Sequence, residues 1–238
     1  MRAPDFWYAN ASVAARLLTP FSWLYNAAGM LRRTFTRPAS VGVPVVCVGN
    51  LVAGGAGKTP VALAVAALLQ DRNPAFLTRG YGGRLSGPVR VDPARHRATD
   101  VGDEALLLAA AAPTWLAHDR AAGARAAAAE GAGVIVMDDG FQNPGIKKDL
   151  SLIVIDGATG YGNGRLIPAG PLRETPVHAI KRAHGIVLIG TDRTRLAGRL
   201  PVALPVFGAR LAPTPGPEVL SGKRVAAFAG IGRPQKFF

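Results

Sequence analysis

The residues with the clearest chemistry stand in a glycine-rich segment that ends in Gly57, Lys58 and Thr59. Glycines let backbone N–H groups converge on phosphate oxygens, a lysine here reaches the outer phosphates of a nucleotide, and a threonine hydroxyl ligates Mg²⁺. An apolar run at residues 45–48 precedes the segment and an alanine- and leucine-rich stretch follows it. We therefore predict a nucleotide-binding loop made of Val52, Ala53, Gly54, Gly55, Ala56, Gly57, Lys58 and Thr59.

The loop departs from the strict P-loop pattern at one position. That pattern has glycine six residues before the lysine, where this sequence has Val52. The alternative is a glycine-rich turn with a surface lysine, but the flanking strand and helix favour the nucleotide loop. Lys58 is accordingly predicted to take part in catalysis.

Two carboxylates, Asp138 and Asp139, follow a second apolar run at residues 134–137. Because ligands of open α/β sheets bind at the carboxyl ends of strands, an aspartate here would face Mg²⁺ bound at Thr59. We predict that these three residues ligate the metal and that Asp139 is catalytic. In the alternative, Asp139 only forms a turn before Gly140.

A loop at residues 164–174 follows a further apolar run and contains two prolines. These prolines would hold Arg173 and Glu174 in a fixed relation at the same edge of the sheet. We predict that Arg173 neutralises charge in the transition state and that Glu174 holds Mg²⁺ directly or through water. The alternative is a proline–glycine loop with an incidental ion pair.

Four further polar residues are candidates for contacts with a substrate. Asp103 begins a helical stretch, where it suits either a helix N-cap or the activation of an acceptor hydroxyl. The neighbouring Glu104 is a candidate substrate contact. Arg79 and Tyr81 leave a strand through a glycine turn; arginine there suits a phosphate and tyrosine a sugar or base face, and the alternative is a plain connection.

Short apolar runs and helical stretches alternate after Pro44. Strands are predicted at residues 45–48, 75–78, 115–117, 134–137, 152–155, 186–189 and 225–228. Helices are predicted near 59–70, 103–112, 119–130, 175–183 and 192–199. This alternation indicates an α/β fold of the P-loop NTPase-like class, with a mostly parallel sheet covered by helices on both faces.

Residues 1–40 differ from the rest because aromatic side chains are mixed with arginines. This composition suits an amphipathic helical segment in a membrane interface, and the alternative is a helical hairpin packed on the domain. Arg16 and Pro20 interrupt any window long enough to span a bilayer. We predict a nucleotide-binding core at 41–212, and a linker with the start of an incomplete, smaller C-terminal lobe at 213–238.

The formal charge of +13 comes from 28 Lys and Arg against 15 Asp and Glu. An excess of this size suits an anionic partner such as phosphates or an acidic membrane face. We predict no nucleic-acid partner, because no zinc finger, basic recognition helix or aromatic RNA-binding sheet is present. The single cysteine, Cys47, lies in an apolar run and is predicted to be a core residue. The sequence predicts no particular oligomeric state.

The motifs in this order closely resemble the tetraacyldisaccharide 4'-kinase family, the lipid A 4'-kinases of Gram-negative bacteria. The resemblance covers essentially the whole chain. Its motifs are Gly49-Asn50-Leu51, the Gly54–Pro60 segment, Arg79-Gly80-Tyr81-Gly82, Gly102-Asp103-Glu104, Asp138-Asp139-Gly140-Phe141-Gln142, Pro168-Ala169-Gly170-Pro171-Leu172-Arg173-Glu174 and Phe228-Ala229-Gly230-Ile231-Gly232-Arg233-Pro234.

The resemblance implies a peripheral kinase at the cytoplasmic face of the inner membrane. It implies transfer of the γ-phosphoryl group of MgATP to the 4'-hydroxyl of an acylated glucosamine disaccharide 1-phosphate. The family uses an aspartate at the position of Asp103, paired with a histidine, to activate the hydroxyl. The loop lysine and threonine, the strand-end aspartates and the Arg173-Glu174 pair act around the phosphates and the metal.

The sequence departs from the family pattern in two places. Asn143 stands where the family usually has histidine, and the chain ends before the Asp-His segment that supplies the partner histidine. We therefore expect a chain truncated at its C-terminus, and one alternative is a nucleotide-binding remnant without kinase activity. The other is a nucleotide-switch ATPase of the partitioning type. It is disfavoured because such proteins have a second lysine where this chain has Ala53.

Overall fold

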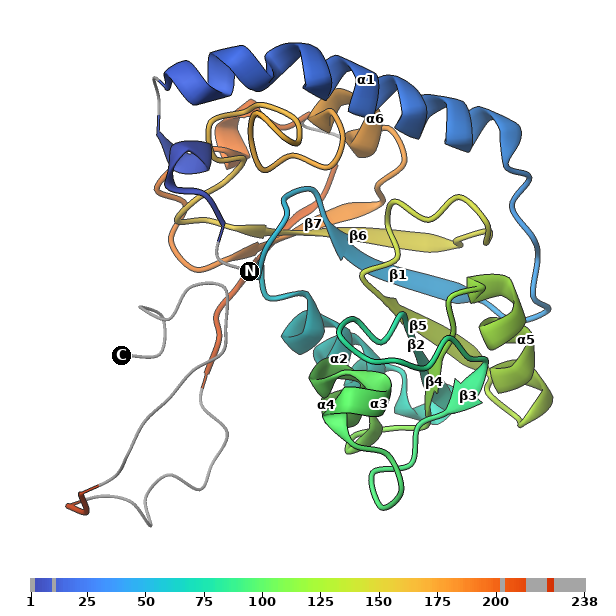
Figure 1. Cartoon of the computed structure of the whole chain (residues 1–238). Helices are drawn as coiled ribbons and strands as arrows, with labels where there is room; N and C mark the ends of the chain where they lie inside the picture. Colours follow the sequence, from blue (N-terminus) through green and yellow to red (C-terminus); the bar gives the residue numbers. More distant parts are fainter. Residues whose placement is uncertain (1–2, 10–11, 202–203, 213–221, 225–238) are drawn as a thin grey trace.

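The computed structural model describes residues 3–9, 12–201, 204–212 and 222–224. Its strands are β1 Val45–Asn50, β2 Pro74–Thr78, β3 Val89–Arg90, β4 Thr114–Leu116, β5 Val134–Asp138, β6 Leu150–Asp156, β7 Gly185–Ile189 and β8 Val206–Ala209. They form one sheet in the order β3-β4-β2-β5-β1-β6-β7-β8, in which only the edge pair β3–β4 is antiparallel (Figure 1). The predicted α/β class with a mostly parallel sheet is confirmed.

Helices pack on both faces of the sheet. They are α1 Val13–Phe35, α2 Lys58–Leu68, α3 Ala98–Val101, α4 Asp103–Ala109, α5 Arg120–Ala129 and α6 Pro176–Ile180, with short 3-10 turns at Asp5–Tyr8, Gln70–Arg72 and Ala197–Arg199. Val48 of β1 packs with Val61 of α2 on one face, whereas Cys47 belongs to the cluster that contains Ala124 of α5. Because both faces are covered, the central strands are apolar throughout instead of alternating with polar residues.

Cys47 is a core residue, as its apolar surroundings predict. Its side chain is fully buried and free. Burial raises the pKa of the thiol to about 12, so the reactive thiolate is not formed near neutral pH.

Several predicted elements differ from the structure at the edges of the sheet. Neither of the edge strands β3 and β8 was predicted from the sequence. The helix predicted at 192–199 is wrong, since only the 3-10 turn Ala197–Arg199 forms there. The Asp192 carboxylate accepts hydrogen bonds from the backbone N–H groups of Leu196 and Ala197 at 3.0 and 2.9 Å, which favours a turn over a helix. The strand predicted at 225–228 lies outside the described residues, and so does most of the predicted C-terminal lobe.

Helix α1 lies on the outside of the molecule, over α6 and the loop that precedes it (Figure 1). It is one continuous helix with Pro20 inside it, not a hairpin. On its inner side, the Ser22 hydroxyl donates to Leu166 O at 2.8 Å and accepts from Ala169 N at 3.2 Å. Its outer side is apolar, with six side chains that are 59–77% exposed: Val13, Leu17, Phe21, Leu24, Leu31 and Phe35. Among the described helices, none has the length and hydropathy needed to cross a membrane.

Candidate active site

The glycine-rich loop connects β1 to the start of α2, at the carboxyl edge of the sheet. Gly54 and Gly57 have φ values of +121° and +86°, which favour glycine. A Cβ at Gly57 would also lie 2.5 Å from the Ile189 side chain. The Asn50 side chain holds the loop from inside, since its amide donates to Val52 O at 2.8 Å. Glycine is therefore required here by both backbone conformation and space, and backbone N–H groups stay accessible at the N-terminus of α2.

Thr59 and Asp138 meet at the base of this loop. The Thr59 hydroxyl donates to Asp138 Oδ2 at 3.1 Å, while Asp138 Oδ1 is buried without a hydrogen-bond partner. Burial, followed by the nearby Glu104 carboxylate, raises the pKa of Asp138 to about 7. A buried oxygen without a donor beside a hydroxyl fits the oxygen ligands that Mg²⁺ prefers.

Asp139 lies between two cations. Its carboxylate is 3.7 Å from Lys58 Nζ and accepts a hydrogen bond from Arg173 at 2.7 Å. Burial alone would raise the pKa of Asp139, but these two cations bring it below its usual value. Asp139 has φ +53° before Gly140, so the predicted turn forms and the carboxylate still points toward the lysine.

The loop that carries Arg173 runs antiparallel to the glycine-rich loop. Ala53 N donates to Pro171 O and Arg173 N donates to Leu51 O, both at 2.7 Å. These backbone contacts hold the Arg173 side chain beside Asp139. Arg173 and Glu174 do not pair with each other, since Arg173 pairs with Asp139 and Glu174 with Arg182.

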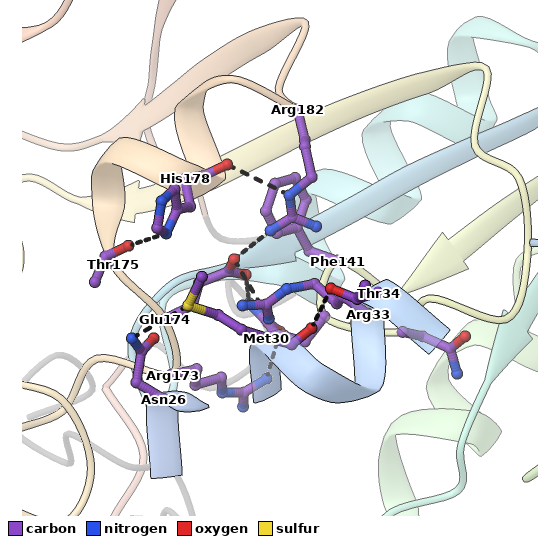
Figure 2. A network of polar contacts seen from close by, with 12 residues as sticks. Asn26, Met30, Arg33, Thr34, Phe141, Arg173, Glu174, Thr175, His178 and Arg182 are labelled. Carbon is purple, nitrogen blue, oxygen red and sulfur yellow. Dashed lines mark hydrogen bonds and ion pairs between the residues drawn. The ribbon is translucent and has the colours of Figure 1, made fainter. Parts of the chain in front are cut away.

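Glu174 is 1% exposed and lies among basic and amide groups (Figure 2). Its Oε1 accepts from the Gln142 amide at 3.1 Å, while its Oε2 pairs with Arg182 and lies 3.8 Å from Arg33. In the part of the chain that the structure describes, no three His, Cys, Asp or Glu side chains converge on a metal-binding position. These contacts do not support Glu174 as a metal ligand.

Gln142 connects Glu174 with the other loops of the site. Its amide nitrogen donates to Asn50 O at 2.9 Å, and its amide oxygen accepts from Arg173 at 3.4 Å. Gln142 therefore joins the start of the glycine-rich loop to the Arg173 loop. The sequence indicated this residue only through its place in the Asp138–Gln142 motif.

Asp103 and Glu104 begin α4. The N-cap is Gly102, whose φ is +85°, so the prediction of Asp103 as an N-cap is wrong. Asp103 is exposed, and its carboxylate accepts only from Glu104 N at 3.0 Å. Glu104 is exposed on the surface but partly desolvated, which raises its pKa, whereas the charge of Lys58 lowers it. None of the chain's four histidines, all of them described, hydrogen-bonds to Asp103.

Arg79 and Tyr81 lie in an exposed turn after β2, and the Tyr81 side chain is 81% exposed. The positive charge of Arg79 acts on Arg120, a residue that the sequence did not single out. Arg120 is 5% exposed, donates to Ala117 O and leaves its Nε buried without a partner. Burial, and then Arg79, lowers the pKa of Arg120 to about 10. The only signal in the sequence was its place near the start of the helix predicted at 119–130, next to Asp119, which is the N-cap of α5.

The site thus combines a phosphate-binding loop with a threonine–aspartate pair and several cations, an arrangement suited to phosphoryl transfer. A family model described as LpxK, Tetraacyldisaccharide-1-P 4'-kinase, matches residues 14–238. The chain belongs to this family. The match spans the aromatic helix α1 as well as the nucleotide loop.

Known tetraacyldisaccharide 4'-kinases align with the whole chain. The protein of Rhodospirillum centenum is 58% identical over 245 residues, which cover 100% of this chain and 73% of the relative. The protein of Parvibaculum lavamentivorans is 53% identical over 247 residues, again over 100% of this chain and 72% of the relative. The nucleotide-switch ATPase is therefore not favoured.

A solved structure of the same family has the same fold. The crystal structure of the "apo" form of LpxK from Aquifex aeolicus in complex with ATP superposes with a TM-score of 0.71 at 32% identity. The match covers 82% of this chain and 64% of the LpxK chain. The P-loop NTPase-like fold predicted for the chain is that of this ATP-bound relative.

Proposed function

We propose that the chain transfers the γ-phosphoryl group of ATP to the 4'-hydroxyl of a tetraacyldisaccharide 1-phosphate, a step of lipid A biosynthesis. Its family membership supports this reaction. The observation that carries the proposal is the meeting of Lys58 with Asp139 and of Thr59 with Asp138 at the carboxyl end of β5. A nucleotide phosphate, a metal ion and an acceptor could all reach this edge of the sheet.

The nucleotide site of the proposal is the loop from Val52 to Thr59. Its glycines keep side chains away from the phosphates, and Lys58 is 9% exposed with its ammonium group already neutralised by Asp139. ATP phosphates would take over part of this neutralisation. Arg173, also held by Asp139, is suited to the charge that develops on the transferred group.

We assign Mg²⁺ to Thr59, Asp138 and Asp139. The unpartnered buried oxygen of Asp138 supports this assignment, and its pKa of about 7 would fall beside a divalent cation. When bound, Mg²⁺ neutralises phosphate charge and acts as a Lewis acid. Glu174 has a different task in this proposal, because it orients Gln142 and through it the two loops of the site.

The acceptor side of the site is formed by α4 and the turn after β2. Asp103 is proposed to position and activate the 4'-hydroxyl, since its carboxylate is exposed and makes no helix cap. Arg79 and Arg120 provide positive charge for anionic groups of the reactants, and the exposed Tyr81 ring suits a sugar face. Glu104, next to Asp103 in α4, is proposed as a further contact with the acceptor substrate.

The protein is proposed to act as a peripheral protein on the cytoplasmic face of the inner membrane. Helix α1 supports this, because its polar side is bonded to the protein and its apolar side is exposed. A soluble helix normally has the reverse arrangement. An apolar outer face flanked by arginines matches a helix that lies in a lipid interface.

Incubation with radiolabelled ATP, Mg²⁺ and the disaccharide lipid, followed by thin-layer separation, tests the reaction. We expect a labelled lipid that depends on both Mg²⁺ and Lys58. Absence of labelled lipid under conditions where ATP binds would refute kinase activity for this chain. Release of free phosphate that a protein partner stimulates, without a lipid product, would instead indicate a nucleotide switch.

A further inference from the structure

A cavity of about 310 Å³ lies between the C-terminal end of α1, the β5–β6 connection and the segment before β7. No residue of the glycine-rich loop lines it. Four of its lining residues are cationic and none is acidic: Arg33, Lys147, Lys148 and Arg182. We refer to this cavity as the Lys148 pocket.

Lys148 is a half-buried cation of this pocket, and like Lys147 it has no ion-pair partner among the described carboxylates. Its ammonium group donates to the carbonyl oxygens of Phe141 and Asn143 at 3.2 and 2.5 Å, and no described carboxylate forms an ion pair with it. Burial lowers the pKa of Lys148, and the nearby Arg182 lowers it further. A charge in this position is stabilised when an anion enters the pocket.

Arg33 and Arg182 share a single carboxylate. Both pair with Glu174 Oε2, and Figure 2 shows their guanidinium groups on different sides of this carboxylate. The Arg182 guanidinium also lies 4.7 Å from the centre of the Phe141 ring. With one negative charge for two guanidiniums, the positive charge of these two lining residues is only partly neutralised.

His184 adds an N–H donor to the lining of the pocket. Its Nδ1 accepts a hydrogen bond from Ser151 N at 3.1 Å, and its own backbone N–H donates to Ser151 O at 2.8 Å. Because Nδ1 is an acceptor, the proton of the neutral ring lies on Nε2. The pocket therefore presents cations and an N–H donor together, a combination that fits a phosphate group.

We propose that the Lys148 pocket binds the phosphate group of an anionic phospholipid. The lipid source is chosen because Arg33 stands on α1 between Leu31 and Phe35, which are 60% and 77% exposed on the outer face. These two side chains would reach the acyl region while the pocket meets the headgroups. The proposal rests on the membrane association proposed above and adds to it a defined headgroup site.

Sedimentation with phosphatidylcholine vesicles, with and without phosphatidylglycerol, tests the proposal on the full chain. Lys147→Glu should reduce the preference for phosphatidylglycerol roughly tenfold, because it replaces an attractive contact with a repulsive one. Lys181→Glu is the matched control, since Lys181 is exposed and does not line the pocket. It should retain most of the preference. Kinase activity on detergent-dispersed substrate should stay unchanged in both variants.

A second pair of variants tests the helix side of the pocket. Arg33→Gln should weaken the same preference, whereas Arg32→Gln, an exposed neighbour outside the pocket, should change it much less. Equal losses in the pocket variants and their controls would show diffuse surface attraction and overturn the site. Stabilisation by inorganic phosphate that is lost in Lys147→Glu, with vesicle preference intact, would assign the pocket to a free anion and also overturn it.

A third variant separates this site from membrane association itself. Leu24→Ser on the outer face of α1 should lower binding to both kinds of vesicle and leave the phosphatidylglycerol preference in place. If the unaltered protein binds neither kind of vesicle, membrane association fails and the headgroup site fails with it. If it binds both equally, only the headgroup site is refuted.

Discussion

The hydroxyl of Thr59 donates a 3.1 Å hydrogen bond to the buried carboxylate of Asp138. This contact joins the first turn of α2 to the carboxyl end of β5, the strand next to β1 in the sheet. The oxygen ligands proposed for Mg²⁺ are therefore held in place by contacts within the fold. The second oxygen of Asp138 is buried without a hydrogen-bond donor, so the ionisation of this residue should affect the stability of the protein.

Asp138 should make the metal-free protein less stable as the pH rises from about 4 to about 7. Its pKa is about 7 in the folded chain, where burial raises it, against the usual 3.8 of an aspartate side chain. In this window the unfolded state binds fewer protons than the folded state, so the free energy of unfolding falls with rising pH. Urea unfolding as a function of pH should show this slope, and Asp138→Asn should remove it together with turnover.

Asp139→Asn is the control for this experiment. The pKa of Asp139 is lowered by Lys58 and Arg173, so its stabilising effect is present above the usual aspartate pKa of 3.8 and lost only at lower pH. The slope between about pH 4 and pH 7 should therefore persist in this variant. A slope that persists in Asp138→Asn as well would contradict the assignment to Asp138.

Lys58→Ala should abolish labelling of the lipid. The substitution removes the ammonium group 3.7 Å from Asp139 and leaves that carboxylate with Arg173 as its ion-pair partner. The pKa of Asp139 should rise in consequence. Enzyme assays measure the loss of turnover, and a calorimetric titration measures the binding of ATP. Full activity in Lys58→Ala would exclude the loop as the phosphoryl-transfer site.

Asp103→Ala should slow the chemical step while ATP binding and the melting temperature remain nearly unchanged. Gly102 is the N-cap of α4 and the Asp103 carboxylate accepts only a local hydrogen bond. The loss of stability should stay within about 0.5 kcal/mol, as for other surface positions. Single-turnover kinetics with thermal unfolding decide the point; a clear drop in melting temperature with normal kinetics would mean a structural role.

Gly49→Ala should destabilise the protein by about 2 kcal/mol, since overpacked cores respond on this scale. The new Cβ would lie 2.5 Å from the Phe141 Cβ, so β1 and the turn after β5 would have to separate. Gly208→Ala is the matched control, because nothing lies within 4 Å of its Cβ position. Denaturant midpoints of the two variants measure the difference, and equal midpoints would show that the turn adapts without cost.

Arg79→Gln should raise the KM for an anionic reactant roughly tenfold, as expected for the loss of a charge-assisted hydrogen bond. The same change should not destabilise the protein, because it removes the repulsion that lowers the pKa of the buried Arg120. Arg95→Gln, an exposed residue paired with Asp92, serves as the control. An unchanged KM in Arg79→Gln would remove this arginine from the reactant site.

The central part of the fold could be predicted from the sequence because its strands are buried on both faces. Short apolar runs such as residues 134–137 then indicate strands directly, and the polar residues after them indicate the functional edge. The edge strands β3 and β8 lack this signal. β8 has exposed residues, including Phe207 at 55%, and its position depends on pairing with β7.

The site was predictable where chemistry is encoded locally and not where it depends on tertiary packing. The loop lysine and threonine stand in one motif, and Asp138 follows its strand in the sequence. Arg120 was not predicted, because an arginine at the start of a helix is common in sequences. Only the structure shows that its Nε is buried without a hydrogen-bond partner. For Glu174, the sequence could not show that Arg33 of α1 and Arg182, which follows α6, would both contact its carboxylate.

The contacts of Ser22 with Leu166 and Ala169 bind α1 to the same loop that supplies Arg173. Two hydrogen bonds therefore join the helix to this loop. If α1 lies in the bilayer interface as proposed above, the depth of its apolar side sets the height of the phosphoryl-transfer groups above the lipid tails. A sugar hydroxyl held at that height by its own acyl chains would meet the nucleotide without the lipid having to leave the membrane.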